Sequence, residues 1–167
     1  MRGTNLQRFS VKSGAVLIRG FQEVGSVRGE LETAIIAEAR EITDASDGTR
    51  TDGMSLEVKS NAAYDKAATS YIDYDEIESL IRGLDYVAKV DKSATKLANV
   101  QADYTTRGDF RISSFSTGEG KMGLAVHSGA IGGTTAYLSL AQAGELRALI
   151  QKAKSTVEAA RPAKPKP

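Results

Sequence analysis

The chain contains no cysteine and only one histidine, His127, among its 167 residues. Without cysteine it can form no disulfide, no thiolate metal site and no cysteine nucleophile, although this does not distinguish cytoplasm from periplasm. Without a second histidine or a G-x-S-x-G elbow, serine-nucleophile and zinc chemistry also lose their usual residues. The sequence therefore predicts no catalytic residue, no metal ligand and no cofactor, and we expect a protein that is not an enzyme.

Proline is almost absent from the body of the chain, because Pro162, Pro165 and Pro167 are its only prolines. A sheet ladder needs the amide hydrogen that proline lacks, so this distribution favours a body of paired strands. Residues 161–167, rich in proline and lysine, are predicted to form a disordered tail.

Long apolar runs and a strong net charge are lacking too. No run approaches the ~20 apolar residues of a membrane span, and the N-terminus has no apolar signal core. We expect a soluble protein with no membrane partner, whose compartment is open because a signal could have been removed ahead of Met1. Lys and Arg total 22 against 21 Asp and Glu, a net charge of +1. No global field therefore steers the chain toward nucleic acid or anionic lipid, and the local excess of positive charge lies after Gln151.

What the chain does contain is a repeat. Met54-Ser-Leu-Glu-Val-Lys-Ser60 reappears as Met122-Gly-Leu-Ala-Val-His-Ser128, and each copy continues through a Tyr-aliphatic pair into a helical pattern. Alternation and β-branched or aromatic residues predict strands on both sides of each copy, separated by glycine-rich turns. In the second half the strands are predicted at 95–105, 109–117, 121–128 and 134–138, with a helix from Leu140. In the first half they are predicted at 15–24, 30–43, 54–60 and 67–72, with a helix at 74–90 and an extra strand at 6–11.

Residues 31–42 fit two structures. Their alanine and glutamate content and their spacing suit a helix about as well as a strand. We predict a strand, because the corresponding segment of the second half, Asp109 to Phe115, does not have a helical pattern.

Both helices begin with the same kind of signal. Ser139 and Gln142 have the spacing of a capping box, and Asp73 and Glu76 are a looser variant of it. The carboxylates of the first helical turn complement the helix dipole, which explains them without catalysis.

The sequence thus predicts an α+β fold of two tandem ββββα units, with antiparallel sheets packed with two helices about a pseudo-two-fold axis. Residues 1–160 are predicted to be a single domain of two repeats, at about 12–90 and 95–160. A four-stranded sheet with one short helix would leave apolar surface exposed, so we expect that the halves cannot fold apart.

Three loops and the histidine have competing interpretations. Gly118–Gly123 matches a phosphate-binding G-x-G-x-x-G, but it opens a strand rather than a helix, which favours a hairpin turn. Residues 129–135 could hold an anion on their backbone amides, but a flexible turn between two strands explains them better. Residues 44–53 could hold calcium, but they lack the spacing of an EF-hand, so a hairpin loop is the better interpretation. Strand parity predicts that His127 lies on the surface.

The order of elements resembles the tandem architecture of the Whirly and PUR families, which bind single-stranded DNA or RNA on sheet surfaces. Lys12-Ser-Gly-Ala-Val-Leu17 is similar to the Whirly stretch Lys-Gly-Lys-Ala-Ala-Leu, with Gly14 in place of the second lysine, and 122–150 is similar in layout to the C-terminal unit of that family. The resemblance implies binding of single-stranded nucleic acid by cations and by aromatic rings that stack on bases. The candidate residues for this are Lys12, Arg19, Phe21, Tyr104, Arg107, Phe110, Arg111 and Lys121.

Our leading hypothesis is a non-catalytic binding or structural module for an unidentified ligand or protein partner. The alternatives are a single-stranded DNA- or RNA-binding protein of Whirly type and an exported bacterial protein with a structural role. Open edges of an antiparallel sheet favour self-association, so a homo-oligomer is a further expectation.

Overall fold

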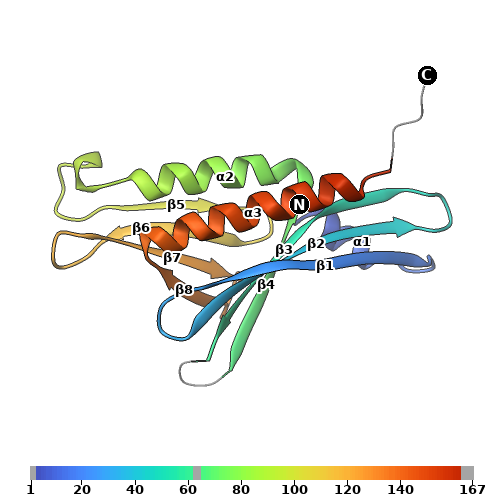
Figure 1. Cartoon of the computed structure of the whole chain (residues 1–167), viewed down its shortest axis with the longest axis horizontal. Helices are drawn as coiled ribbons and strands as arrows, with labels where there is room; N and C mark the ends of the chain where they lie inside the picture. The colour runs from blue at the N-terminus through green and yellow to red at the C-terminus, as the bar shows by residue number, and fades with distance from the viewer. Residues whose placement is uncertain (1–2, 62–64, 163–167) are drawn as a thin grey trace.

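A computed structural model describes residues 3–61 and 65–162 of the chain (Figure 1). It contains two four-stranded antiparallel sheets, each followed by a helix, as the sequence predicts for an α+β fold of two ββββα units. The first half consists of α1 (Asn5–Ser10), β1 (Leu17–Arg28), β2 (Thr33–Asp44), β3 (Arg50–Ser60), β4 (Lys66–Asp73) and α2 (Tyr74–Lys89). The second half consists of a short 3-10 turn (Lys92–Ala94), β5 (Gln101–Thr105), β6 (Phe110–Ser116), β7 (Met122–Ser128), β8 (Thr134–Leu138) and α3 (Leu140–Ala160).

The ambiguous segment at 31–42 is a strand, and this prediction is confirmed. Within β2, Ile35 and Ala37 are fully buried while Ile36 between them is only half-buried. This alternation is the pattern of a strand with one face in the core. Pairing with β1 on one side and β3 on the other outweighs the helical propensity of the alanines and glutamates, since β2 is an inner strand of its sheet.

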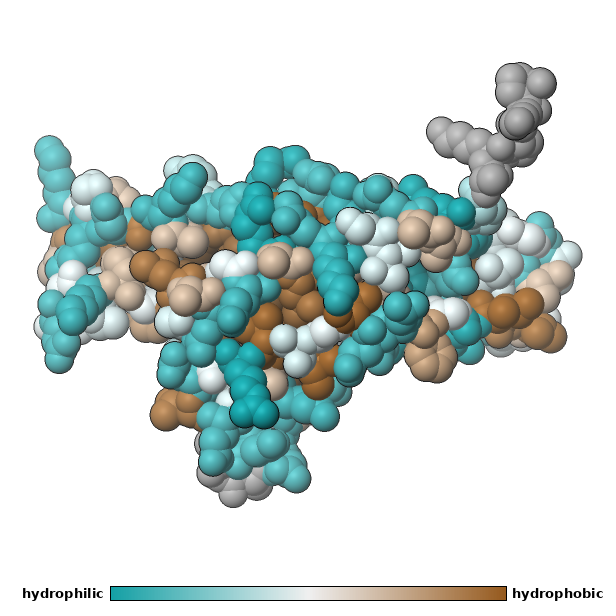
Figure 2. All heavy atoms as spheres, viewed as in Figure 1, coloured by the Kyte–Doolittle hydropathy of each residue, from teal (hydrophilic) through white to brown (hydrophobic). Residues whose placement is uncertain are grey.

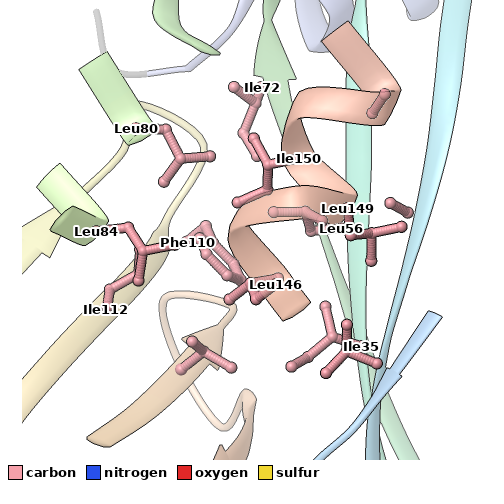
Figure 3. Packing of buried hydrophobic residues seen from close by; sticks show 14 of the residues in the cluster. Ile35, Leu56, Ile72, Leu80, Leu84, Phe110, Ile112, Leu146, Leu149 and Ile150 are labelled. Atoms are coloured by element: carbon pink, nitrogen blue, oxygen red, sulfur yellow. The ribbon is translucent and has the colours of Figure 1, made fainter. Parts of the chain in front are cut away.

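Each helix covers the sheet of the other half. α3 packs across β1, β2 and β3, whereas α2 packs against β5 and β6 and also against α3. Figure 3 shows the result: Leu80 and Leu84 of α2 face Phe110 and Ile112 of β6, and Ile150 of α3 lies among them. The apolar stripes of both helices and the inner faces of both sheets thus form one core.

The extra strand predicted at 6–11 is wrong, because residues 5–10 form the helix α1. Thr4 and Gln7 form a capping box that starts this helix, and the buried side chain of Leu6 holds it against the first sheet. The strand predicted at 95–105 is also shorter than expected, since only its last part is β5.

Of the two predicted helix caps, the one at the start of α3 forms and the one at the start of α2 does not. Ser139 and Gln142 make both bonds of the box at the start of α3, at 3.1 and 2.8 Å. Asp73 is the first residue before α2 as predicted, but its side chain does not cap α2. Its carboxylate instead accepts hydrogen bonds from the amides of Asn5 and Leu6, at 2.7 and 3.0 Å, and so caps α1.

The end of α3 leads into the predicted tail. Arg161 donates two hydrogen bonds to Asp52 of β3, at 2.7 and 2.9 Å. Its guanidinium also lies 3.7 Å from the centre of the Tyr74 ring. The prediction of a disordered tail is therefore wrong at Arg161, and residues 163–167 of that tail lie outside the described residues.

Candidate functional site

The first sheet extends beyond the helix that covers it. We call this part of the sheet the open end; it comprises Leu17–Glu23 of β1 and Arg40–Asp44 of β2. Ile18 is 59% exposed and Phe21 is 68% exposed, although their side chains point to opposite faces of β1. Figure 2 shows hydrophobic side chains gathered at the end of the molecule where β1 begins in Figure 1. Val16, directly before β1, and Val11, directly after α1, are also exposed. Exposed apolar side chains thus lie on both faces of this end of the sheet.

β1 is the edge strand of its sheet, and within residues 3–61 and 65–162 no strand pairs with its outer side. The amide of Ala45 donates to the carbonyl of Val16 at 2.9 Å, so the backbone groups of Val16 point toward β2. Orientation alternates along an antiparallel strand, and the register with β2 is regular until the bulge after Glu23. Within the described residues, no other segment bonds to the outward-facing groups. These groups belong to Leu17, Arg19, Phe21 and Glu23.

The free stretch ends at the bulge for a steric reason. Gly25 has a φ of +151°, and a side chain there would begin 3.0 Å from Leu149 of α3. Beyond this point β1 passes under α3 and its side chains Val24 and Val27 are buried. The exposed edge is therefore confined to the open end.

The outer face of the open end carries an arginine between two aromatic rings. The guanidinium of Arg40 lies 6.0 Å from the Phe21 ring and 5.4 Å from the Tyr71 ring. Arg40 also donates to Ser55 at 2.9 Å and pairs with Glu38 at 2.6 Å. These contacts hold the arginine in place and leave most of the Phe21 ring in solvent.

A groove of about 130 Å³ lies where the C-terminal end of α3 meets the open end. Backbone and side chains of β1 and β2 form its floor and the last turn of α3 forms its wall. Its lining includes Gly20, Gln22, Ala39, Glu41, Val157 and Ala160.

Carboxylates beside this groove are bound by arginines. Asp52 is 7% exposed and pairs with Arg50 and Arg161, each at 2.7 Å, and Glu41 also pairs with Arg50. Burial opposes ionisation of Asp52, but the hydrogen bonds from Arg161 and Arg50 outweigh it and hold its pKa below the ordinary value. A carboxylate kept ionised and doubly paired is suited to fixing the end of α3 rather than to transferring protons.

The structure brings together three of the residues predicted to bind nucleic acid. Lys12, Arg19 and Phe21 all belong to the open end or to the loop that enters it. Lys12 pairs with Asp44 at 2.7 Å and lies 4.5 Å from the centre of the Phe9 ring. Arg19 is exposed and donates to the carbonyl of Ser10 at 3.0 Å.

The other five candidates belong to the second half. The expectation that Phe110 stacks on a base is wrong, because its side chain is fully buried in the core. Tyr104 packs beneath α2 at Gly83. Arg107 lies among three carboxylates, 2.6 Å from Asp75, 3.7 Å from Glu76 and 3.9 Å from Asp73. Arg111 is exposed on β6, and Lys121 is exposed in the turn before β7.

Two of the three loops and the histidine make hydrogen bonds within local structure. Residues 117–121 close a hairpin between β6 and β7 through bonds between Thr117 and Lys121, which agrees with the predicted turn. Asp44 and Asp47 accept bonds from Ser46 and Thr49 of their own loop. Among residues 3–61 and 65–162, no group of three or more acidic or histidine side chains is arranged to hold a metal. His127 is half-buried and hydrogen-bonded to Thr135 at 2.7 Å.

Sequence reasoning missed the free edge, Arg40 and Glu23. The exposure of an edge depends on which strand ends the sheet and where the covering helix stops, and neither is written in local composition. Arg19, Phe21 and Glu23 alternate along the sequence, and this spacing alone indicates that their side chains share one face of the strand.

The chain matches no family model, and no curated protein and no solved structure matches it. In the part of the chain that the structure describes, none of the helices has the length and apolarity to cross a membrane.

Proposed function

We propose that the protein is a non-catalytic binding module whose open end receives an extended segment of a polypeptide. The observation that carries this proposal is the free edge of β1 from Leu17 to Glu23, which presents unpaired backbone donors and acceptors beside exposed apolar side chains. In strand addition, main-chain hydrogen bonds give affinity and alternate side chains give specificity.

The surroundings of the edge support a binding role. Phe21 on the outer face and Ile18 on the opposite face would both contact an added strand, because cross-strand neighbours lie about 4.5–5.5 Å apart. Arg40 and Arg50 are already neutralised by carboxylates of the same sheet. Apolar contact and backbone pairing, rather than charge attraction, are therefore the main sources of affinity at this surface.

The test is a selection of extended peptides that bind the protein but not an edge-blocked variant, Arg19→Pro. Proline is tolerated at this position because the amide of Arg19 points away from β2. Selected peptides should protect the amides of Leu17–Glu23 from hydrogen exchange when they bind. Gln22→Pro is the matched control for orientation: its amide faces β2, so losing this ladder hydrogen bond should destabilise the sheet by about 1–3 kcal/mol, whereas Arg19→Pro should cost much less.

Peptides that bind both proteins equally, or that protect amides elsewhere, would contradict the proposal. So would a selection that yields no edge-dependent peptide while Arg19→Pro remains folded by circular dichroism.

Binding of single-stranded nucleic acid is a second candidate, because Arg8, Lys12 and Arg19 lie with Phe9 and Phe21 around α1 and the open end. This function predicts binding of oligo-dT, measured by fluorescence anisotropy, that weakens steeply with salt. Phe21→Ala should weaken it by about 1–3 kcal/mol if the ring stacks on a base. Lys92→Ala, which removes an exposed cation of the 3-10 turn in the second half, should leave this binding unchanged. Absence of binding at low salt would exclude this candidate.

A further inference from the structure

Two charged side chains at the free edge have no ionic partner among the described residues. Arg19 donates only to a backbone carbonyl, and Glu23 makes no side-chain hydrogen bond or ion pair there, although most neighbouring charges are paired. Both project to the outer face, one on each side of Phe21 and two residues from it. The edge is therefore positive, aromatic and negative in order along the strand.

This order of charges is complementary to the same strand running in the opposite direction. An antiparallel copy of β1 placed about a two-fold axis at Phe21 sets Arg19 opposite Glu23 of the other copy, and Glu23 opposite its Arg19. Phe21 meets its own counterpart at the centre. Residues 19, 21 and 23 all direct their backbone groups outward, so these pairs are hydrogen-bonded pairs of a regular ladder.

Other registers fit less well. Moving the axis to Gly20 sets Leu17 opposite Glu23 and leaves both charges unpaired. Moving it to Arg19 sets two arginines opposite each other, which is destabilising. Moving it toward the C-terminus runs the ladder into the bulge before Gly25.

The opposite face of the strand agrees with the same register. Ile18, which is exposed in the single chain, comes opposite Val24 of the other copy, whose side chain belongs to the core beneath α3. Ile18 then lies next to the mouth of the groove at the end of α3. One arrangement thus covers exposed apolar side chains on both faces.

We infer that the occupant of the β1 edge is a second copy of this chain, paired antiparallel about Phe21 so that the two first sheets become one continuous sheet. This inference rests on the proposed use of the edge for strand addition and names its partner. It is an isologous contact, which closes at two copies and leaves no edge of β1 free.

Sedimentation velocity of the full chain over a concentration series measures the dimer directly. The wild type should dimerise, and Arg19→Glu or Glu23→Arg should each weaken dimerisation by about tenfold or more, since both create facing like charges. An equimolar mixture of these two variants should form a heterodimer, because every facing pair is then opposite in charge. The double variant R19E/E23R should regain the wild-type constant to within about threefold.

Arg28→Glu is the matched control, since it makes the same charge change on an exposed residue of β1 beyond the bulge. It should leave dimerisation unchanged, and thermal melts should show that every variant is folded.

A wild type that stays monomeric at millimolar concentration overturns the inference, as does a dimer that survives both reversals or is not restored by mixing the variants. The proposed function would then still be supported if edge-dependent peptides are selected by the wild type over Arg19→Pro. If the selection yields no edge-dependent peptide but dimerisation responds to the charge reversals as expected, then the β1 edge binds only a second copy of the chain.

Discussion

Asp44 joins the loop after α1 to the turn between β2 and β3. Its carboxylate accepts from Lys12 at 2.7 Å and from the amide and hydroxyl of Ser46 at 2.9 and 2.6 Å. The bond from Lys12, followed by those from Ser46, lowers the pKa of Asp44 to about 2, and the same pairing raises the pKa of Lys12. This contact fixes the loop that leads into the open end.

The lowered pKa makes this contact sensitive to acid. The value in the unfolded chain is about 3.9, so the stabilisation is complete above that pH and is lost as the pH falls through the folded value. We expect the melting temperature of the protein to exceed that of Asp44→Asn at pH 6 and the difference to shrink toward pH 2. Lys12→Met should lower the melting temperature at pH 6 by a similar amount, and the double variant should be little less stable than either single variant. A difference that is the same at both pH values would contradict this account.

Two helical glycines should respond in opposite ways to the same substitution. A side chain at Gly83 of α2 would begin 2.5 Å from the Tyr104 ring, whereas nothing lies within 4 Å at Gly144 of α3. Gly83→Ala should destabilise the protein by about 1–3 kcal/mol through overpacking. Gly144→Ala should stabilise it by about 0.5–1 kcal/mol through helix propensity. Urea unfolding measures both, and equal effects of the two substitutions would refute the close packing of α2 on β5.

At the scale of elements, α1 depends on residues outside itself. A helix of six residues is too short to be stable alone in water, so its cap and its buried side chain must hold it. Thr4 and Gln7 form its capping box, and the carboxylate of Asp73, at the end of β4, accepts from two further amides of the same helix start. Asp73, the residue directly before α2, thus links the start of α2 to the start of α1.

Removing that carboxylate should therefore release α1 and spare α2. We expect Asp73→Ala to cost about 1–3 kcal/mol, because two amides lose an ionised acceptor, and to speed hydrogen exchange throughout residues 5–10. Ser139→Ala should cost about 1 kcal/mol and affect only the first turn of α3. Faster exchange at the start of α2 in Asp73→Ala would show that the predicted local cap exists after all.

The sequence predicted most elements for reasons visible in their residues. β6, β7 and β8 are short alternating segments between tight turns, and α2 and α3 carry regular apolar stripes, so their positions follow from local pattern. α1 does carry a local signal, since Thr4 and Gln7 have the spacing of a capping box, but its two further N-terminal bonds go to Asp73, far along the chain. The same long-range contact explains why the predicted capping box of α2 does not form.

At the scale of the whole molecule, the exchange of helices between sheets makes the halves interdependent. Without α3 the buried side chains of β2 and β3, such as Ile35 and Leu56, would face water. Without α2 the same would hold for Phe110 and Ile112 of β6. Each half therefore lacks the helix that it needs.

Fragments should show this directly. We expect residues 1–90 and 91–167, made separately, to give no cooperative thermal transition, and an equimolar mixture to recover one. Circular dichroism at the helix minimum is a suitable measurement, with the intact chain as reference. A cooperative transition in either fragment alone would contradict the interdependence.

The site was less predictable than the fold. Lys12, Arg19 and Phe21 were selected for charge and aromatic character, and they do lie at the open end. Phe110 was selected by the same criteria but is in the core, since its strand position points inward. The exposure of a strand edge depends on where a helix from the other half stops, and local composition does not encode that distance.

The position of α3 has a consequence for how the protein is made. A chain leaves the ribosome from its N-terminus, so β1 to β4 emerge long before the residues that will cover them. The apolar face of these strands stays uncovered until α3, Leu140–Ala160, has been translated. A chain that ends before this last helix would keep the apolar face of β1 to β4 exposed, which favours aggregation.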